Sequence, residues 1–161
     1  MTPTDISVTA VERWIESPLK QFVEDAQALL ALLLNASGQV LGQHGFTRAV
    51  DVMAACALAA AIHASSSELG RLMQGSPFGA LHHAGRGRQL FLAAPETARG
   101  TLVFLTVFDS ASSLGIVQLY FEELRARLAE AAPPPRSSAP VVLAQDFESD
   151  LDRNLALLFH R

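Results

Sequence analysis

The hydrophobic positions near the N-terminus recur at steps of three and four residues, which is the period of one helix face. They are Val8, Val11, Ile15, Leu19, Phe22 and Ala26. The pattern predicts a helix over residues 7–26. Inside it Pro18 follows Ser17, and a serine N-cap with a proline in the first turn is typical of a helix start. We therefore expect the helix to begin at residues 17–18 or to kink there.

Short apolar segments, separated by turn residues, predict a β-sheet. They lie at residues 29–34, 39–42, 80–84, 89–93 and 101–108. The first two flank the polar, glycine-containing turn 35–38 and so predict a hairpin. Because residues 29–34 and 101–108 are apolar at consecutive positions, we expect both to be strands that are covered on two faces.

A long helix is predicted over residues 51–74, and Gly75, Ser76 and Pro77 end it. At the helical period it carries two stripes. The stripe of larger side chains, which we expect to pack on the sheet, is Ala55, Leu58, Ile62, Leu69 and Leu72. The stripe of mostly small side chains is Met53, Ala57, Ala60, Ala64, Ser67 and Arg71.

Small residues allow another helix to approach closely. We therefore expect the small stripe to form a dimer or partner interface, with the chain's own helices as the alternative cover. Residues 80–84 are short, and as an edge strand they would expose unpaired backbone groups. This strand adds His82 to the predicted interface of a two-fold dimer.

The C-terminal part divides into a helix, a linker and a tail. Residues 114–131 have helical periodicity and close a domain over residues 1–132. Residues 133–145 begin PPPRSSAP, which predicts an extended linker. Residues 146–161 predict a short acidic amphipathic helix that docks in cis or in trans. Its apolar contact face is Phe147, Leu151, Leu155 and Phe159.

The order of elements predicts an α/β fold. A helix, two strands, a long helix, three strands and a helix fit an αβα sandwich with a roughly five-stranded antiparallel sheet. The long helix would cover one face, and the first and last helices the other.

Composition narrows the class of protein. Half of the 161 residues are hydrophobic and 17% are charged, which favours a partner surface. The net charge of -4 argues against nucleic-acid binding. A single cysteine excludes an internal disulfide and a cysteine-based zinc site. We also expect no signal peptide, no apolar run of the roughly 18 residues that span a membrane, and a cytoplasmic location.

Residue types that carry chemistry do not form a convincing active site. His44, His63, His82 and His83 match no zinc spacing. The serines at 65–67 lack a nucleophile-elbow motif, and Cys56 on the alanine-rich helix fits a small buried hydrophobe. The segment Gly85-Arg86-Gly87-Arg88 is interpreted as a hairpin turn, not a phosphate loop, because no Gly-Lys-Ser/Thr follows it. We expect no cofactor, no metal and no enzymatic activity of the chain itself.

Several stretches, in order and spacing, resemble the roadblock family of domains related to dynein light chains. They are the turn with residues 35–41 (NASGQVL), residues 69–73 (LGRLM) followed by Pro77-Phe78, residues 107–110 (VFDS) and residues 113–119 (SLGIVQL). Within that family, the tail segments 147–152 (FESDLD) and 157–159 (LLF) favour the bacterial MglB group.

The resemblance implies a homodimer that pairs its third strand and long helix with those of a second copy. It implies a Ras-like small GTPase of the MglA type as partner, in cell-polarity signalling. MglB proteins raise the partner's GTP hydrolysis by remodelling its switch loops, without inserting an arginine, and their C-terminal helix is linked to a second surface of the GTPase. A roadblock scaffold or adaptor with no effect on hydrolysis is the alternative function.

Overall fold

The computed structural model describes residues 12–135. Most of the predicted linker and the whole predicted tail helix, with Phe147, Leu151, Leu155 and Phe159, lie outside these residues. The elements in chain order are α1 (Arg13–Ala26), β1 (Leu30–Asn35), β2 (Val40–Gly45), a 3-10 turn (Thr47–Ala49), α2 (Val52–Gln74), β3 (Ala80–Ala84), β4 (Gln89–Ala93), β5 (Glu96–Thr97), β6 (Gly100–Phe108) and α3 (Leu114–Ala131).

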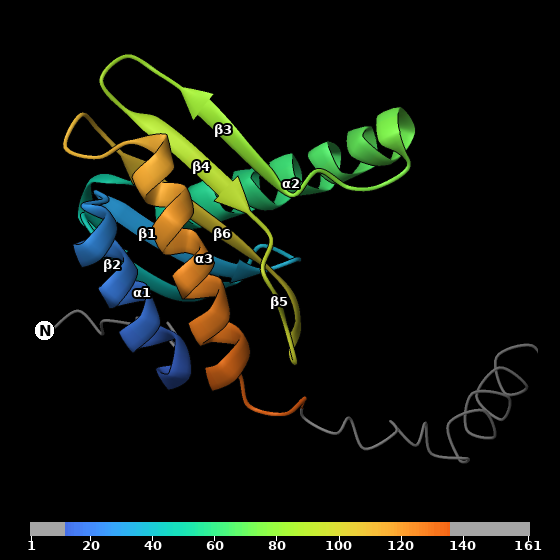
Figure 1. Ribbon diagram of the computed structural model, residues 1–161, viewed down its shortest axis with the longest axis horizontal. Helices are drawn as coiled ribbons and strands as arrows, with labels where there is room; N and C mark the ends of the chain where they lie inside the picture. The colour runs from blue at the N-terminus through green and yellow to red at the C-terminus, as the bar shows by residue number, and fades with distance from the viewer. Residues whose placement is uncertain (1–11, 136–161) are drawn as a thin grey trace, which may run out of the picture.

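The strands form one antiparallel sheet in the order β2-β1-β6-β4-β3, and the short β5 pairs with the start of β6. The expected sheet of about five strands is confirmed, with β6 at its centre and β2 and β3 at its edges. Helices α1 and α3 lie side by side over one face, and α2 crosses the other (Figure 1). The αβα sandwich predicted from the element order is therefore confirmed.

Two hydrophobic layers explain why β1 and β6 are apolar on both faces. On the side of α1 and α3, Ala31, Leu33 and Phe104 pack with Phe22, Phe121 and other residues of the helices. On the side of α2, Leu30, Leu32 and Leu34 of β1, which alternate along the strand with Ala31 and Leu33, pack against the long helix. Consecutive strand residues point to opposite faces, so an unbroken apolar run is what two covered faces require.

The start of α1 differs from the sequence expectation. The helix begins at Arg13, after Glu12 in an extended conformation, and Pro18 lies in its interior. A helix start at residues 17–18 is therefore wrong, and no single helix runs unbroken from residue 7 to residue 26. An interior proline removes one backbone hydrogen bond, but burial of the apolar face outweighs that loss. The buried residues are Ile15, Leu19, Phe22 and Ala26.

The orientation of α2 also differs from the expectation. Its buried residues are small: Cys56, Ala59, Ser67 and Gly70. Leu58, Leu69 and Leu72, which were expected against the sheet, are 64%, 51% and 77% exposed, whereas Ala55 and Ile62 pack partly against the core. The strands beneath α2 already supply large leucine side chains, so only small residues fit on the sheet-facing side of the helix.

Candidate dimer and partner surface

Exposed large hydrophobic side chains gather on α2. Among the described residues there are eight of them, and five lie on this helix. The full set is Phe46, Met53, Leu58, Leu69, Leu72, Met73, Ile116 and Leu119. Apolar side chains concentrated on one element, instead of scattered singly, are typical of a surface that another molecule covers.

The length and mean hydropathy of α2 reach the values of a membrane-spanning helix, so the expectation that no apolar run is long enough needs correction. Only 17% of its most apolar 18-residue window is buried. The helix nevertheless packs on the sheet through the side that carries its small residues. It also carries a charged pair, Glu68 and Arg71, which form an ion pair at 3.3 Å. The remaining apolar surface of α2 is exposed in the single chain.

A groove runs between α2 and the edge strand β3. Its volume is about 400 Å³. It is lined by Leu58, Ala61, Ile62, Ser65, Ser66, Leu69, Phe78 and Leu81. The lining is mostly apolar, and one side of it is the outermost strand of the sheet. A second molecule could therefore pair with the backbone of β3 and bury the groove at the same time.

Two glycines set the path of the chain from the end of α2 to the start of β3. Gly75 ends α2 in the left-handed conformation, at φ +78°, and the chain then folds back along the helix to β3. Gly70 makes this return possible, because a β-carbon at that position would lie 2.6 Å from the backbone nitrogen of Phe78. The close approach of the two segments brings the Phe78 ring to the groove.

The two histidines of β3, His82 and His83, lie on opposite faces of the strand. His82 is exposed, its ring centroid is 6.2 Å from that of Phe108, and its Nε2 is 2.8 Å from Gln89 Oε1. The neighbouring His83 pairs with Leu90, which belongs to the layer under α2. His82 therefore lies on the open edge of the sheet but on the side of α1 and α3.

The small stripe predicted on α2 occupies a different side of the helix from the groove. Met53, Ala57, Ala64 and Arg71 are exposed, Ala60 is partly buried and Ser67 is buried. Ala60 is partly covered by this chain's own β1–β2 turn, which runs next to α2. A β-carbon on Gly38, in that turn, would lie 3.5 Å from the Ala60 β-carbon. The structure thus brings four of the six residues to the surface and leaves two partly or fully covered.

Residue types that carry catalytic chemistry are not assembled in the described part of the chain. No group of three or more His, Cys, Asp or Glu residues there could hold a metal ion. Burial raises the pKa of the Cys56 thiol, which disfavours the reactive thiolate. The Arg86 and Arg88 side chains are exposed at a tight turn that is closed by the Gly85 N–H donating to the Arg88 carbonyl at 2.9 Å.

Comparison with known proteins identifies the architecture. No family model and no curated protein sequence matches the chain. Among solved structures, Myxococcus xanthus MglB has a TM-score of 0.69 and 24% identity, covering 74% of this chain and 94% of that one. The gliding protein MglB of Thermus thermophilus has a TM-score of 0.65 and 25% identity, covering 76% and 90%. The roadblock/LC7 domain of Streptomyces avermitilis has a TM-score of 0.59 and 19% identity, covering 73% and 93%.

The chain has the roadblock fold. Its likeness to two MglB structures agrees with the MglB-like features of its sequence. Another similar structure is described as MglB with a tetrameric arrangement, at a TM-score of 0.65 and 25% identity.

Sequence reasoning missed the groove beside β3. It assigned Leu58 and Leu69 to the core and did not consider Phe78 as a surface residue. The sequence did contain an indication of this groove. Three large apolar residues, Leu69, Leu72 and Met73, lie in the last turns of α2, and this helix extends past the sheet (Figure 1). A helix end with more large side chains than its sheet can cover indicates a second apolar contact.

Proposed function

We propose that this chain is an MglB-like regulator that acts as a homodimer on a Ras-like small GTPase and raises its rate of GTP hydrolysis. The observation that carries the proposal is the uncovered apolar side of α2, beside an open sheet edge, in a chain whose fold resembles MglB. A chain without an assembled active site in its described part, but with such a surface, acts through a partner.

In this proposal the groove side of α2 and the β3 edge hold the second copy. Pairing two β3 strands about a two-fold axis would place Leu58, Ile62 and Leu69 against their counterparts and satisfy the open backbone groups. The two copies of α2 would then lie on the same face of a continuous sheet. That face, with the exposed Met53, Ala57, Ala64 and Arg71, is where the GTPase would bind.

The proposed mechanism is positioning: the dimer holds the GTPase's switch loops where its own residues meet the γ-phosphate and the attacking water. It requires no inserted arginine. Arg71 is already paired with Glu68, and Arg86 and Arg88 lie at a hairpin tip. An inserted arginine contributes about 10³- to 10⁵-fold to hydrolysis, so substituting each of these three arginines with alanine separates the two mechanisms.

The deciding experiment measures phosphate release from the cognate GTPase, loaded with GTP, with and without the chain. We expect stimulation above about tenfold, which is about 1.4 kcal/mol of activation free energy. Each arginine variant that still binds the GTPase is expected to keep most of this stimulation. Binding with no stimulation would replace the proposal with an adaptor function. Loss of stimulation in one arginine variant that still binds would replace positioning with an arginine mechanism.

A further inference from the structure

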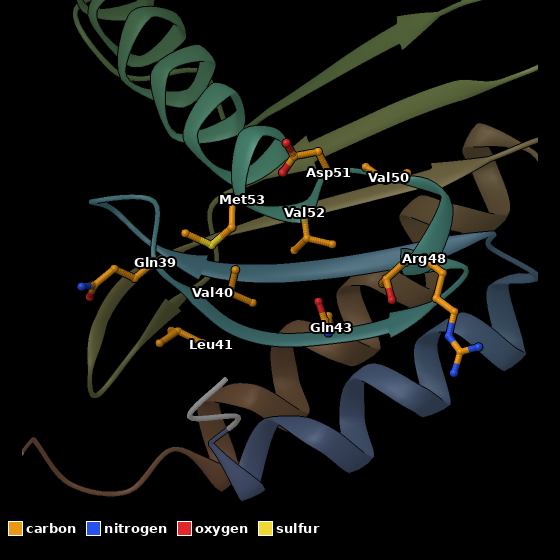
Figure 2. Close-up of a pocket in the computed structure, with 10 residues that line it drawn as sticks. Gln39, Val40, Leu41, Gln43, Arg48, Val50, Asp51, Val52 and Met53 are labelled. Atoms are coloured by element: carbon orange, nitrogen blue, oxygen red, sulfur yellow. The ribbon is translucent and has the colours of Figure 1, made fainter. Parts of the chain in front are cut away.

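The two edges of the sheet differ in how regularly they can pair with another strand. Edge strand β2 is irregular, because Val40 and Gly42 pair with consecutive residues of β1 and leave Leu41 as an extra residue. The Leu41 carbonyl oxygen already accepts the Glu12 N–H at 3.1 Å. A groove of about 770 Å³ separates β2 from residues 47–53 (Figure 2). The regular edge is β3, which pairs with β4 without a shift in register.

The direction of the backbone groups of β3 follows from the hydrogen bonding of its hairpin. The Gly85 N–H donates to the Arg88 carbonyl oxygen at 2.9 Å, so the backbone groups of Gly85 face β4. Groups that face the neighbouring strand and groups that face away alternate along an antiparallel strand. Because the register of β3 and β4 is constant, the N–H and C=O groups of Ala80, His82 and Ala84 point away from β4. They form the open edge of the sheet.

These groups pair completely with a second copy in only one two-fold arrangement. When a strand pairs antiparallel with its own copy about a two-fold axis, one residue lies opposite its counterpart. With His82 on the axis, Ala80 of each copy pairs with Ala84 of the other, and all three outward-facing residues have partners. An axis at Leu81 or His83 shifts the pairing by two residues and leaves one of the three beyond the end of the strand. The register with the most backbone hydrogen bonds therefore has His82 on the axis.

This register brings the two His82 side chains together on one face of the sheet. Each lies on the side of α1 and α3, because His82 pairs with Phe91, which belongs to the layer beneath those helices. Opposite residues of a hydrogen-bonded pair have Cα atoms about 5.5 Å apart, and their side chains share a face. The neighbours on that face, Ala80 and Ala84, are too small to separate the two imidazoles. Each ring also stacks on Phe108 at an interplanar angle of 20°.

The carboxylates around His82 are engaged elsewhere. Next to the ring, β4 places the neutral Gln89, whose Oε1 is 2.8 Å from the His82 Nε2. The charged residues in the β3–β4 turn, in β5, at the end of β6 and in the first half of α3 are Arg86, Arg88, Glu96, Asp109, Glu122, Glu123 and Arg125. Both glutamates of α3 form ion pairs with arginines of the same helix. Glu96 accepts the Thr101 hydroxyl, and Asp109 accepts the Ala111 N–H.

We propose that two copies of this chain pair through β3 with His82 on the two-fold axis, and that protonation of this histidine pair weakens the dimer. The inference rests on the dimer of the proposed function and adds its register and its regulation. Imidazole changes charge between about pH 5 and 8, and like charges directly opposite each other in a sheet are destabilising. The separate copies therefore bind more protons than the dimer, and association strengthens as pH rises through this range.

The test measures the dissociation constant of the dimer, by sedimentation of the full chain at about pH 7.5 and about pH 5.5, within the range where imidazole changes charge. We expect dissociation to be at least about tenfold easier at the lower pH, from the repulsion of two close unit charges. His82→Gln should remove the difference, because glutamine takes up no proton. His83→Gln is the matched control and should keep it, because His83 lies opposite Leu81 of the second copy. Circular dichroism checks that the fold is intact at both pH values.

Cysteine substitution tests the register without a change in pH. A disulfide spans Cα atoms about 5.5 Å apart, so His82→Cys should form a covalent dimer under oxidising conditions. His83→Cys should cross-link much more slowly, because the two copies of that residue are not opposite each other. The native Cys56 is buried and gives the wild-type background. Faster cross-linking of His83→Cys than of His82→Cys overturns the register.

The outcomes separate this inference from the dimer on which it rests. A dissociation constant that is equal at both pH values, or a pH dependence that survives in His82→Gln, overturns the switch and leaves the dimer in place. Loss of the dependence in His83→Gln alone moves the axis to that residue and overturns the register. A wild-type chain that is monomeric at the higher pH overturns the dimer of the proposed function, and the switch with it.

Discussion

Gly70 and Phe78 lie so close that a β-carbon on residue 70 would be 2.6 Å from the Phe78 backbone nitrogen. The contact joins the last turns of α2 to the segment that leads into β3. We expect Gly70→Ala to lower the free energy of unfolding, since an overpacked site costs about 1–3 kcal/mol and the helix propensity of alanine returns only about 1 kcal/mol. Urea denaturation measures the change.

Gly115 in α3 provides the matched control, because a β-carbon there would meet nothing within 4 Å. Gly115→Ala should leave stability unchanged or raise it slightly. If Gly70→Ala proves as harmless as Gly115→Ala, the close packing at Phe78 does not constrain the path into β3.

The groove beside β3 predicts which substitutions break the dimer. Leu58 and Leu69 are exposed within one chain, so glutamate at both positions should leave the fold and the circular dichroism unchanged. In the proposed dimer these residues are buried, and an unpaired charge there costs about 3–5 kcal/mol. Sedimentation at tens of micromolar should therefore show monomers for Leu58→Glu with Leu69→Glu.

Leu119 is the control for this pair. It is a large exposed hydrophobic residue on α3, on the opposite face of the sheet, so Leu119→Glu should remain a dimer. If the α2 double variant sediments as a dimer while Leu119→Glu does not, the interface lies on the α1 and α3 side instead.

The small stripe predicts that partner binding can be lost without loss of the fold. Ala64 is exposed and Ala60 is only partly covered, so arginine at both positions adds bulk and charge where the partner is proposed to approach. The double variant Ala60→Arg with Ala64→Arg should keep its helical dichroism but lose GTPase binding, dimerisation or both. Pull-down with the GTP-loaded partner and light scattering measure the two. Failure to fold would place the stripe in the internal core.

The sequence predictions agree best with the structure where the local residue pattern determines the ends of a helix or strand. The predicted bounds 80–84, 89–93 and 114–131 coincide with β3, β4 and α3, because turn residues and caps lie on either side of them. Ser113, for example, accepts a hydrogen bond from the Ile116 N–H at the start of α3, which is the usual role of an N-cap serine.

The predictions disagree with the structure where a tertiary contact determines which side of a helix is buried or where a helix begins. Periodicity identifies apolar positions on α2 but does not distinguish Cys56, which faces the sheet, from Leu58, which faces outward. The larger side chain was assigned to the core because burial of large side chains is the common case. Likewise, Ser17-Pro18 has the local features of a helix start, yet α1 begins where the Glu12 N–H reaches Leu41 of β2.

The C-terminal segment is predicted to be dispensable for the fold. Among the described residues, the last buried core position is Leu128, and α3 ends at Ala131. Deleting residues 133–161 should therefore shift Tm by less than about 4 °C, which corresponds to about 1 kcal/mol in a domain of this size, and should keep the dimer. Thermal unfolding and sedimentation of the truncated chain provide the check, and an unfolded or monomeric product would make the tail a structural part of the domain.

Cys56 links stability to alkaline pH. The side chain is 0% exposed, and desolvation by burial raises the pKa of its thiol. In the unfolded chain the thiol ionises near its ordinary pKa of about 8.5, whereas in the folded chain it keeps its proton to a higher pH. The unfolded state therefore binds fewer protons above about pH 8.5, and the free energy of unfolding must fall as pH rises through that range.

The variant Cys56→Ala lacks this group but shares every other titrating residue with the wild-type chain. Urea denaturation at about pH 7 and about pH 9.5, on either side of the ordinary thiol pKa, should show a larger loss of stability in the wild-type chain than in the variant, even though the variant starts lower because of the cavity it creates. Equal losses in both chains would mean that the Cys56 thiol ionises as easily in the folded protein as in the unfolded one. In that case water reaches the sheet-facing side of α2, and this helix is less tightly joined to the sheet than the burial of Cys56 indicates.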